Sequence, residues 1–519
     1  MTLHVRIAAA LAAALALAAC NGGGSGNIAA VPPPGNPGTV ASAAKLSIAG
    51  VGDSLTAGTQ SGGTMGAAIP GPLGTIPGIG LIAPPPVGVP ATQENGFFSL
   101  LWQQANGVSL AFMSNPATSP LPLLKPPGVG GLLAPTQTHI FPAPVSNTCD
   151  ASQIPANTFS TALSLRLNPA LNPWDVAIPG ATAHEALFMV GATGDCGVNP
   201  ANSPATFVSL NSLVNGESQN FWPILGGFGQ GVTQVEAAKS LHAQVATVWL
   251  GSNDLLKPAF SGGLAPVTAP QSMHDDIKSI ILQLQGAGSK VAVANLVDVM
   301  GAATFIPVPA YQPTLQAYIS GILQSPPNNL PAPVANAIAL QYSTAYAAQE
   351  IAQTGMGPNG YFTINALFKT LQTAAAQIPA SAPPVAPALG SGDFVADAVA
   401  NNVKALNAAY NASIAQAASE TGAALVDIHA LFVQIATAGG VPVNPPKCCS
   451  LVYRGGLSSL DGLHPSNTGY AIIANAWIAQ LNTSYNLGIP AVNVGAVYAT
   501  DPYAPGNGVS GFSVLRSPQ

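Results

Sequence analysis

Short apolar segments alternate with amphipathic ones along most of the chain. Runs rich in β-branched and apolar residues, with the composition of strands buried on both faces, occur at residues 45–51, 109–113, 174–178, 244–250, 290–296 and 423–428. Apolar residues recur at helical spacing in the segments 97–105, 232–242, 272–285, 396–420 and 467–481. Strands that alternate with helices are typical of a parallel sheet covered on both faces. The pattern therefore predicts an α/β fold with a central, mostly parallel sheet.

Two stretches interrupt this alternation. Residues 60–90 are dense in Gly and Pro, and residues 302–393 mix helical pieces with Pro-rich breaks. We interpret both as insertions in one domain over residues 45–496, which a tail over residues 497–519 follows. A loop as long as the first is uncommon in a compact domain unless it serves binding. It is therefore a candidate wall or lid of a binding site, with a surface elaboration as the alternative.

The N-terminus has the pattern of an export signal. Arg6 precedes an apolar run that ends at residue 19 and is too short to cross a bilayer. Leu17-Ala18-Ala19-Cys20 resembles the lipobox of bacterial lipoproteins, which implies that residues 1–19 are removed and that Cys20 is acylated. Residues 20–44, rich in Gly, Pro, Ala and Ser, fit a flexible tether. An ordinary secretory signal with a chance cysteine is the alternative.

This terminus predicts where the protein resides. An acylated Cys20 would anchor an exported protein to a membrane of the bacterial cell envelope, the outer membrane in a Gram-negative cell.

Charged residues make up only 6% of the chain, against about 25% in an average globular protein. The formal net charge is -6, and no basic run could neutralise a phosphate backbone. The composition therefore argues against nucleic acid as a partner.

The remaining cysteines are even in number, which favours disulfides in an oxidising compartment. They are Cys149, Cys196, Cys448 and Cys449. Of the three possible pairings we favour Cys149 with Cys196, which leaves Cys448 and Cys449 as a strained vicinal pair or as free thiols. A zinc site is less favoured because adjacent cysteines lack the usual two-residue spacer and no paired histidines lie nearby.

A candidate nucleophile follows the first predicted strand. The strand leads into Gly52-Asp53-Ser54-Leu55, which places a hydroxyl at the carboxyl edge of the sheet. Open α/β folds bind their ligands at this edge. On its own the tetrapeptide could equally mark a helix that begins at a capping serine.

A candidate base lies near the other end of the chain. Asp461 and His464 are three residues apart, so the carboxylate can hold the imidazole in one tautomer. Gly462 permits the tight backbone between them. A local turn bond is the alternative, and a metal site is disfavoured because no second histidine or cysteine stands at ligand spacing.

Two further segments at strand ends offer hydrogen-bond donors. Gly180 follows the run at residues 174–178, and Asn253 follows the run at residues 244–250. Acyl transfer requires donors aimed at the developing oxyanion, each worth about 3 kcal/mol of barrier. The N–H groups of Ser54 and Gly180 and the amide of Asn253 could supply them, although Asn253 alone would pass for a turn residue.

Together these blocks resemble the SGNH (GDSL) hydrolase family over residues 45–481. The family has a serine block, a glycine block, a Gly-x-Asn-Asp block and an Asp-x-x-His block in this order, here around Ser54, Gly180, Asn253 and His464. The resemblance implies a three-layer α/β/α sandwich of flavodoxin-like topology with no metal and no organic cofactor. The absence of a Gly-x-Ser-x-Gly elbow argues against the α/β-hydrolase fold.

The resemblance also implies a role for each of these residues. Ser54 is then the nucleophile, His464 the base, Asp461 the acid that orients it, and Ser54, Gly180 and Asn253 the oxyanion donors. The implied activity is lipase or esterase hydrolysis of a small-molecule or lipid ester through an acyl-enzyme. A carbohydrate O-acetylesterase or thioesterase would use the same residues, and a non-catalytic lipoprotein that binds a partner through its insertions is a further alternative. His184 and His429 are minor candidates for the site.

Overall fold

The computed structural model describes most of the chain beyond the N-terminal segment. The described residues are 38–39, 45–60, 63–68, 91–125, 166–189, 224–228, 232–325, 328–378, 383–390, 392–444, 447–504 and 507. All of them belong to the compact unit Asn36–Gln519. The predicted signal peptide, Cys20 and most of the tether lie outside them, so these predictions stay untested.

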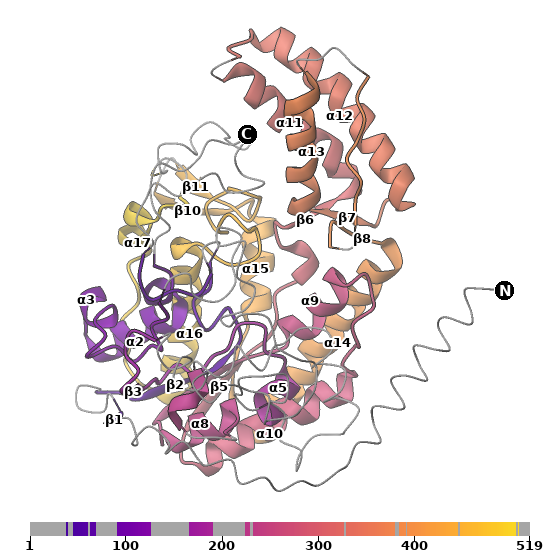
Figure 1. Cartoon of the computed structure of the whole chain (residues 1–519). Helices are drawn as coiled ribbons and strands as arrows, with labels where there is room; N and C mark the ends of the chain where they lie inside the picture. Colours follow the sequence, from indigo (N-terminus) through magenta and orange to yellow (C-terminus); the bar gives the residue numbers. More distant parts are fainter. Residues whose placement is uncertain are drawn as a thin grey trace, which may run out of the picture. The chain divides into compact units, whose positions relative to one another are not determined.

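Four parallel strands form the central sheet (Figure 1). Their order is β2 (Ile48–Gly52), β4 (Val245–Trp249), β5 (Lys290–Ala294) and β9 (Ala424–Val426). Every residue of β2 and β4 is buried, which explains why both read as continuous apolar runs. Four of the six predicted strands are thus confirmed, with ends that differ by a few residues.

The segment predicted as a strand at residues 174–178 extends this sheet beside β2. It runs parallel to β2 through a bridge between Asp175 and Gly50. The amides of Val176 and Ile178 donate to the carbonyls of Gly50 and Gly52 at 2.9 and 3.0 Å. Its carboxyl end therefore reaches the same edge of the sheet as the end of β2.

The strand predicted at residues 109–113 is wrong, because this segment forms the short helix α3 (Leu110–Met113). The side chain of Ser109 caps the helix by accepting a hydrogen bond from the amide of Phe112. Of the four residues in α3, only Met113 is buried. A capping serine and a single buried side chain favour one helical turn over a strand.

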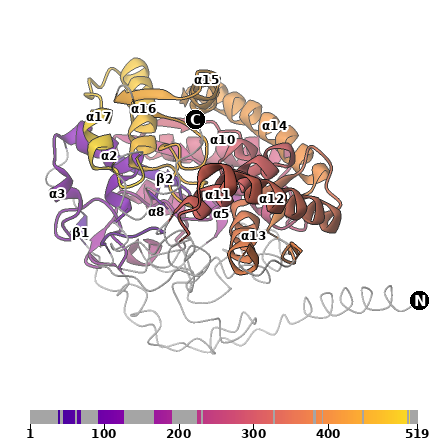
Figure 2. The same ribbon diagram turned by 90° about the horizontal axis from the view of Figure 1, so that it is seen from above.

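Helices cover both faces of the sheet. Helices α2 (Phe97–Asn106) and α16 (Asn467–Tyr485) pack together on one side. On the other side α10 (Pro270–Gly286) packs against α14 (Asp397–Thr421) and α8 (Gln234–Ser240). Figure 2 shows β2 between α2 and α8. This arrangement confirms the predicted α/β/α sandwich.

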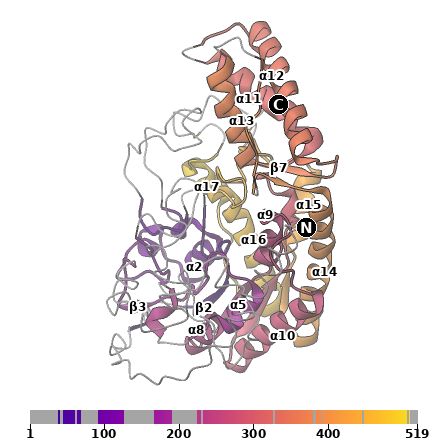
Figure 3. The same cartoon turned by 45° about the vertical axis from the view of Figure 1, so that its right-hand side comes forward.

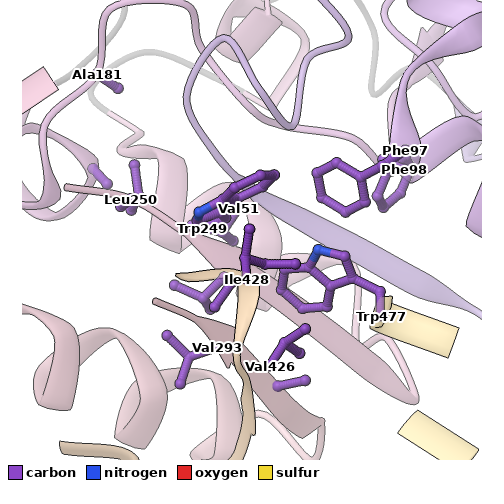
Figure 4. Packing of buried hydrophobic residues seen from close by; sticks show 14 of the residues in the cluster. Val51, Phe97, Phe98, Ala181, Trp249, Leu250, Val293, Val426, Ile428 and Trp477 are labelled. Carbon is purple, nitrogen blue, oxygen red and sulfur yellow. The ribbon is translucent and has the colours of Figure 1, made fainter. Parts of the chain in front are cut away.

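Aromatic side chains fill the core between the sheet and α2 and α16 (Figure 4). The ring of Phe97 stacks on Trp477 at a centroid distance of 5.3 Å and meets Trp249 edge-on at 5.4 Å. Aromatic pairs of this kind contribute about 1 kcal/mol each beyond the area they bury. They fix α2 and α16 against the end of β4, close to the edge of the sheet where the site residues lie.

A second apolar core lies mainly between residues 306 and 386, and Met65 and Leu460 also belong to it. Helices α11 (Val308–Gln324), α12 (Ala332–Thr354) and α13 (Ile364–Gln377) lie side by side in Figure 3. A small antiparallel sheet joins them, with the order β6 (Phe305–Pro307), β7 (Tyr361–Thr363) and β8 (Phe394–Val395). These elements occupy the stretch interpreted as the second insertion. In the part of the chain that the structure describes, no helix is long and apolar enough to span a bilayer.

One carboxyl group is buried inside this second core and makes its stability depend on pH. Burial raises the pKa of Glu350 on α12 from 4.5 to about 7, although the hydroxyl of Thr370 donates to its carboxyl group. The pKa of Glu350 is higher in the folded protein than in the unfolded one. Its contribution to the free energy of unfolding is therefore fully present below about pH 4.5 and is lost as the pH rises through 7. The full effect is on the order of 3 kcal/mol.

We therefore expect Glu350→Gln to remove most of the pH dependence of stability in this region. The variant should gain thermal stability relative to the wild type at about pH 8 and little at about pH 5. Thermal unfolding followed by circular dichroism at both values measures this. Parallel melting-temperature profiles for the two proteins would contradict the expected effect.

Candidate active site

Ser54 lies at the carboxyl edge of the sheet, directly after β2. The chain turns there, with the amides of Ala57 and Thr59 donating to the carbonyls of Asp53 and Ser54 at 3.0 and 2.9 Å. A Cβ on Gly52 would overlap Thr56, so this tight turn needs glycine at the end of the strand. The turn presents the serine side chain at the edge where open α/β sheets bind ligands.

His464 and Asp461 lie beside this serine, although 410 positions of sequence separate His464 from it. Nε2 of His464 lies 2.9 Å from Oγ of Ser54, and Nδ1 lies 2.6 Å from Oδ2 of Asp461. The other carboxylate oxygen of Asp461 accepts hydrogen bonds from the amides of Leu463 and His464, both at 2.9 Å. The structure thus brings the three predicted residues into one continuous hydrogen-bonded chain.

The electrostatics of Asp461 suit the task of orienting an imidazole. Burial by itself would raise the pKa of Asp461, but the facing His464 and the hydrogen bonds that the carboxylate accepts hold this pKa below the usual 3.8. The carboxylate therefore stays ionised at neutral pH and keeps a proton on Nδ1 of His464. Nε2 is then free to accept the proton of the Ser54 hydroxyl.

The loop that carries these residues depends on Gly462. Its φ is +66°, and a Cβ there would lie 2.8 Å from the amide nitrogen of Thr304. The same amide donates to the carbonyl of Gly462 at 2.8 Å. Helix α16 begins just after the loop, where the side chain of Ser466 accepts from the amide of Gly469 at 3.1 Å. A tight turn and a capped helix together fix the direction of the imidazole.

The predicted oxyanion donors reach the same edge. Gly180, with φ +90°, turns the chain after the segment beside β2, and Asn253 lies in the first turn of α9 (Ser252–Phe260) after β4. Nδ2 of Asn253 donates to the carbonyl of Ala181 at 3.0 Å and to Oδ2 of Asp53 at 3.2 Å. Asn253 thus bonds to the neighbours of both Gly180 and Ser54. These bonds use both hydrogens of its amide, so donation to an oxyanion requires that one of them be released.

Asp53 is the residue whose part in the site the sequence did not reveal. It is only 1% exposed, and one oxygen accepts from the amide of Leu55 at 2.9 Å while the other accepts from Asn253. Burial raises its pKa to about 7, against the opposing effects of the Leu55 hydrogen bond and the facing His464. The position of Asp53 directly before Ser54 was the feature of the sequence that could have indicated this role.

The other candidates lie elsewhere. His184 on α5 (Ala183–Phe188) pairs with Asp276 of α10 at 3.1 Å, and the amide of His429 on α15 (Ile428–Thr437) donates to Asn295. The ring that meets Ser54 is that of His464. Among the described residues, no three His, Cys, Asp or Glu side chains are grouped so that they could hold a metal ion.

The structure describes the side chain of one cysteine, Cys449, which is buried at the end of β11 (Lys447–Cys449). Cys149 and Cys196 lie outside the described residues, as does the side chain of Cys448. The predicted disulfide between Cys149 and Cys196 therefore stays a prediction.

Comparison with known proteins adds one match. The family model described as GDSL-like Lipase/Acylhydrolase matches residues 152–477. This stretch contains Gly180, Asn253, Asp461 and His464, and it begins after Ser54. None of the curated proteins matches the chain.

Proposed function

Because the chain belongs to the GDSL-like lipase/acylhydrolase family, whose activity is ester hydrolysis, we propose that it is a carboxylic ester hydrolase with Ser54 as nucleophile. The match confirms the family predicted from the four sequence blocks. The observation that carries the proposal is the hydrogen-bonded chain from Oγ of Ser54 through His464 to Asp461. A serine hydroxyl is a poor nucleophile until a base removes its proton, and this chain provides the base and its orienting acid.

The mechanism follows from these contacts. As Ser54 attacks the acyl carbonyl carbon, Nε2 of His464 takes the hydroxyl proton, and ionised Asp461 stabilises the resulting imidazolium. The carbonyl oxygen becomes an oxyanion, for which the N–H groups of Ser54 and Gly180 and the amide of Asn253 are donors. His464 then gives its proton to the leaving alcohol as the ester bond breaks, and water hydrolyses the acyl-enzyme by the same steps.

Hydrolysis of p-nitrophenyl butyrate by the full chain tests the proposed activity. An acetylated polysaccharide and an acyl thioester, offered in parallel, separate a carboxylic esterase from an O-acetylesterase and a thioesterase that would use the same residues. Release of p-nitrophenol at a rate well above that of either rival reaction is the expected result. Turnover of neither the p-nitrophenyl ester nor the rival substrates would contradict ester hydrolysis by this site.

Substitution of Asn253 tests the oxyanion site. We expect Asn253→Ala to lower kcat by about 10²- to 10³-fold, because one donor to the oxyanion is lost. KM should change much less, since the donor acts on charge that develops only in the transition state. Steady-state kinetics on p-nitrophenyl butyrate measures both constants. A kcat within about threefold of wild type would remove Asn253 from the oxyanion site.

We also propose that acylated Cys20 anchors the enzyme to a membrane of the cell envelope, as the lipobox-like sequence before it predicts. In a bacterial host, the full chain should then incorporate a fatty-acid label and sediment with membranes. Cys20→Ala should abolish the label and release the protein. Unchanged labelling of the variant would contradict acylation at this residue.

A further inference from the structure

A buried hydrogen bond joins the turn that carries Ser54 to the helix that follows His464. The amide of Thr59 donates to the carbonyl of Ser54 at 2.9 Å, and the carbonyl of Thr59 accepts from the hydroxyl of Tyr470 at 2.7 Å. Tyr470 lies in the first turn of α16, whose capping residue Ser466 is two positions after His464. A short path therefore runs from the nucleophile through Thr59 and Tyr470 to the loop of the base.

Tyr470 is well suited to hold this position. Its side chain is fully buried, so its ring cannot move without disturbing the core. Burial, followed by the nearby carboxylates of Asp461, Asp53 and Asp175, raises the pKa of Tyr470 well above its usual 10. The hydroxyl therefore remains a donor at every pH at which the enzyme would be assayed, and the bond to Thr59 persists.

A second bond runs parallel to the first. Nε2 of Gln60 donates to Oδ1 of Asn467, the first residue of α16, at 2.6 Å, and both side chains are buried. The turn after Ser54 is thus held to the first turn of α16 at two adjacent residues, Thr59 and Gln60. Two attachment points restrict rotation of the turn as well as its translation.

We propose that Tyr470 is a positioning residue that keeps the Ser54 hydroxyl within hydrogen-bond reach of His464. The inference rests on the proposed function, because it assigns Tyr470 an effect on the reaction of that serine. A displacement of about 1 Å between reacting groups can cost a factor of about 100 in rate. Loss of the Tyr470 hydroxyl frees the carbonyl of Thr59 and lets the turn move relative to the base.

Tyr485 provides a matched control on the same helix. Its hydroxyl also donates to a main-chain carbonyl in the sheet, that of Val291. Val291 lies near the amino-terminal end of β5, at the edge opposite Ser54. Tyr→Phe at either position removes one hydroxyl and keeps the ring. Only the change at Tyr470 touches the path to Ser54.

The test compares Tyr470→Phe and Tyr485→Phe with wild type in the full chain. Steady-state kinetics on p-nitrophenyl butyrate and the rate at which a fluorophosphonate labels Ser54 are measured below the melting temperature of each protein. We expect Tyr470→Phe to lower kcat and the labelling rate by about 10- to 100-fold with little change in KM. Tyr485→Phe should keep both rates within about twofold of wild type.

The outcomes separate this inference from the proposed function. If Tyr470→Phe melts earlier but reacts as fast as Tyr485→Phe, its role is structural only and the inference is overturned. If wild type neither hydrolyses the ester nor is labelled, both proposals fall. If Tyr470→Phe folds poorly, Asn467→Ala provides a second test, because it removes the bond from Gln60 to the first turn of α16. We expect this variant to lower kcat at constant KM by less than is expected for Tyr470→Phe. An unchanged kcat would overturn the inference.

Discussion

Replacement of Ser54 by alanine should lower kcat for p-nitrophenyl butyrate by about 10⁴- to 10⁶-fold. The change removes the only atom that can form the acyl-enzyme in the proposed mechanism, and it leaves the oxyanion donors in place. Residual hydrolysis above the rate in water is expected from those donors. Stopped assays at high enzyme concentration measure the remaining rate.

The neighbouring base provides a sharper form of this experiment. His464→Ala should lose about as much activity as Ser54→Ala, and the double variant should lose little more than either one. Residues that act as a unit show this lack of additivity, because once one of them is gone the other has no further role. Ser484→Ala, at an exposed serine near the end of α16, is the control and should retain wild-type turnover. Losses that multiply in the double variant would contradict a joint role for Ser54 and His464.

Replacement of Asp461 by asparagine should lower kcat by about 10⁴-fold. The amide can donate a hydrogen bond to Nδ1 of His464, which would place the ring proton on Nε2, the nitrogen that must accept from Ser54. Because the pKa of Asp461 lies below 3.8, the wild-type carboxylate is ionised throughout an assay near neutral pH. Asp461 should therefore contribute no ionisation of its own to the wild-type pH profile near neutral pH.

A pH profile of kcat/KM checks this assignment. The wild-type profile should show no step from Asp461 near neutral pH, and turnover requires a neutral His464, because an imidazolium cannot act as base. Asp461→Glu, which keeps the charge with a longer side chain, is the control and should recover part of the rate lost in Asp461→Asn. An Asp461→Asn enzyme with near wild-type kcat would show that the carboxylate does not orient the base.

Local sequence patterns predicted most of the sheet and the residues that meet at its edge. The strands β2, β4 and β5 are buried on both faces, so their composition alone distinguished them from loops. Ser54 follows a predicted strand and His464 precedes a predicted helix, so the local sequence marks both positions. The helix at residues 110–113 was missed because an apolar run of that length fits a strand or a helix turn equally well.

Other parts of the site depend on contacts that no local pattern records. The bond from Asn253 to Asp53 spans 200 positions, and that from Tyr470 to Thr59 spans 411. Whether two such side chains meet depends on the packing of whole elements. The strands β6, β7 and β8 are two or three residues long, too short for an alternating pattern to show.

The most direct test of the central claim is to locate the covalent adduct that a fluorophosphonate forms with the full chain. Peptide mass spectrometry should find one modified residue, Ser54, and the modification should disappear in His464→Ala because the hydroxyl is no longer activated. An adduct at another residue, or none in an enzyme that still hydrolyses the ester, would contradict the assignment of Ser54 as the nucleophile that His464 activates.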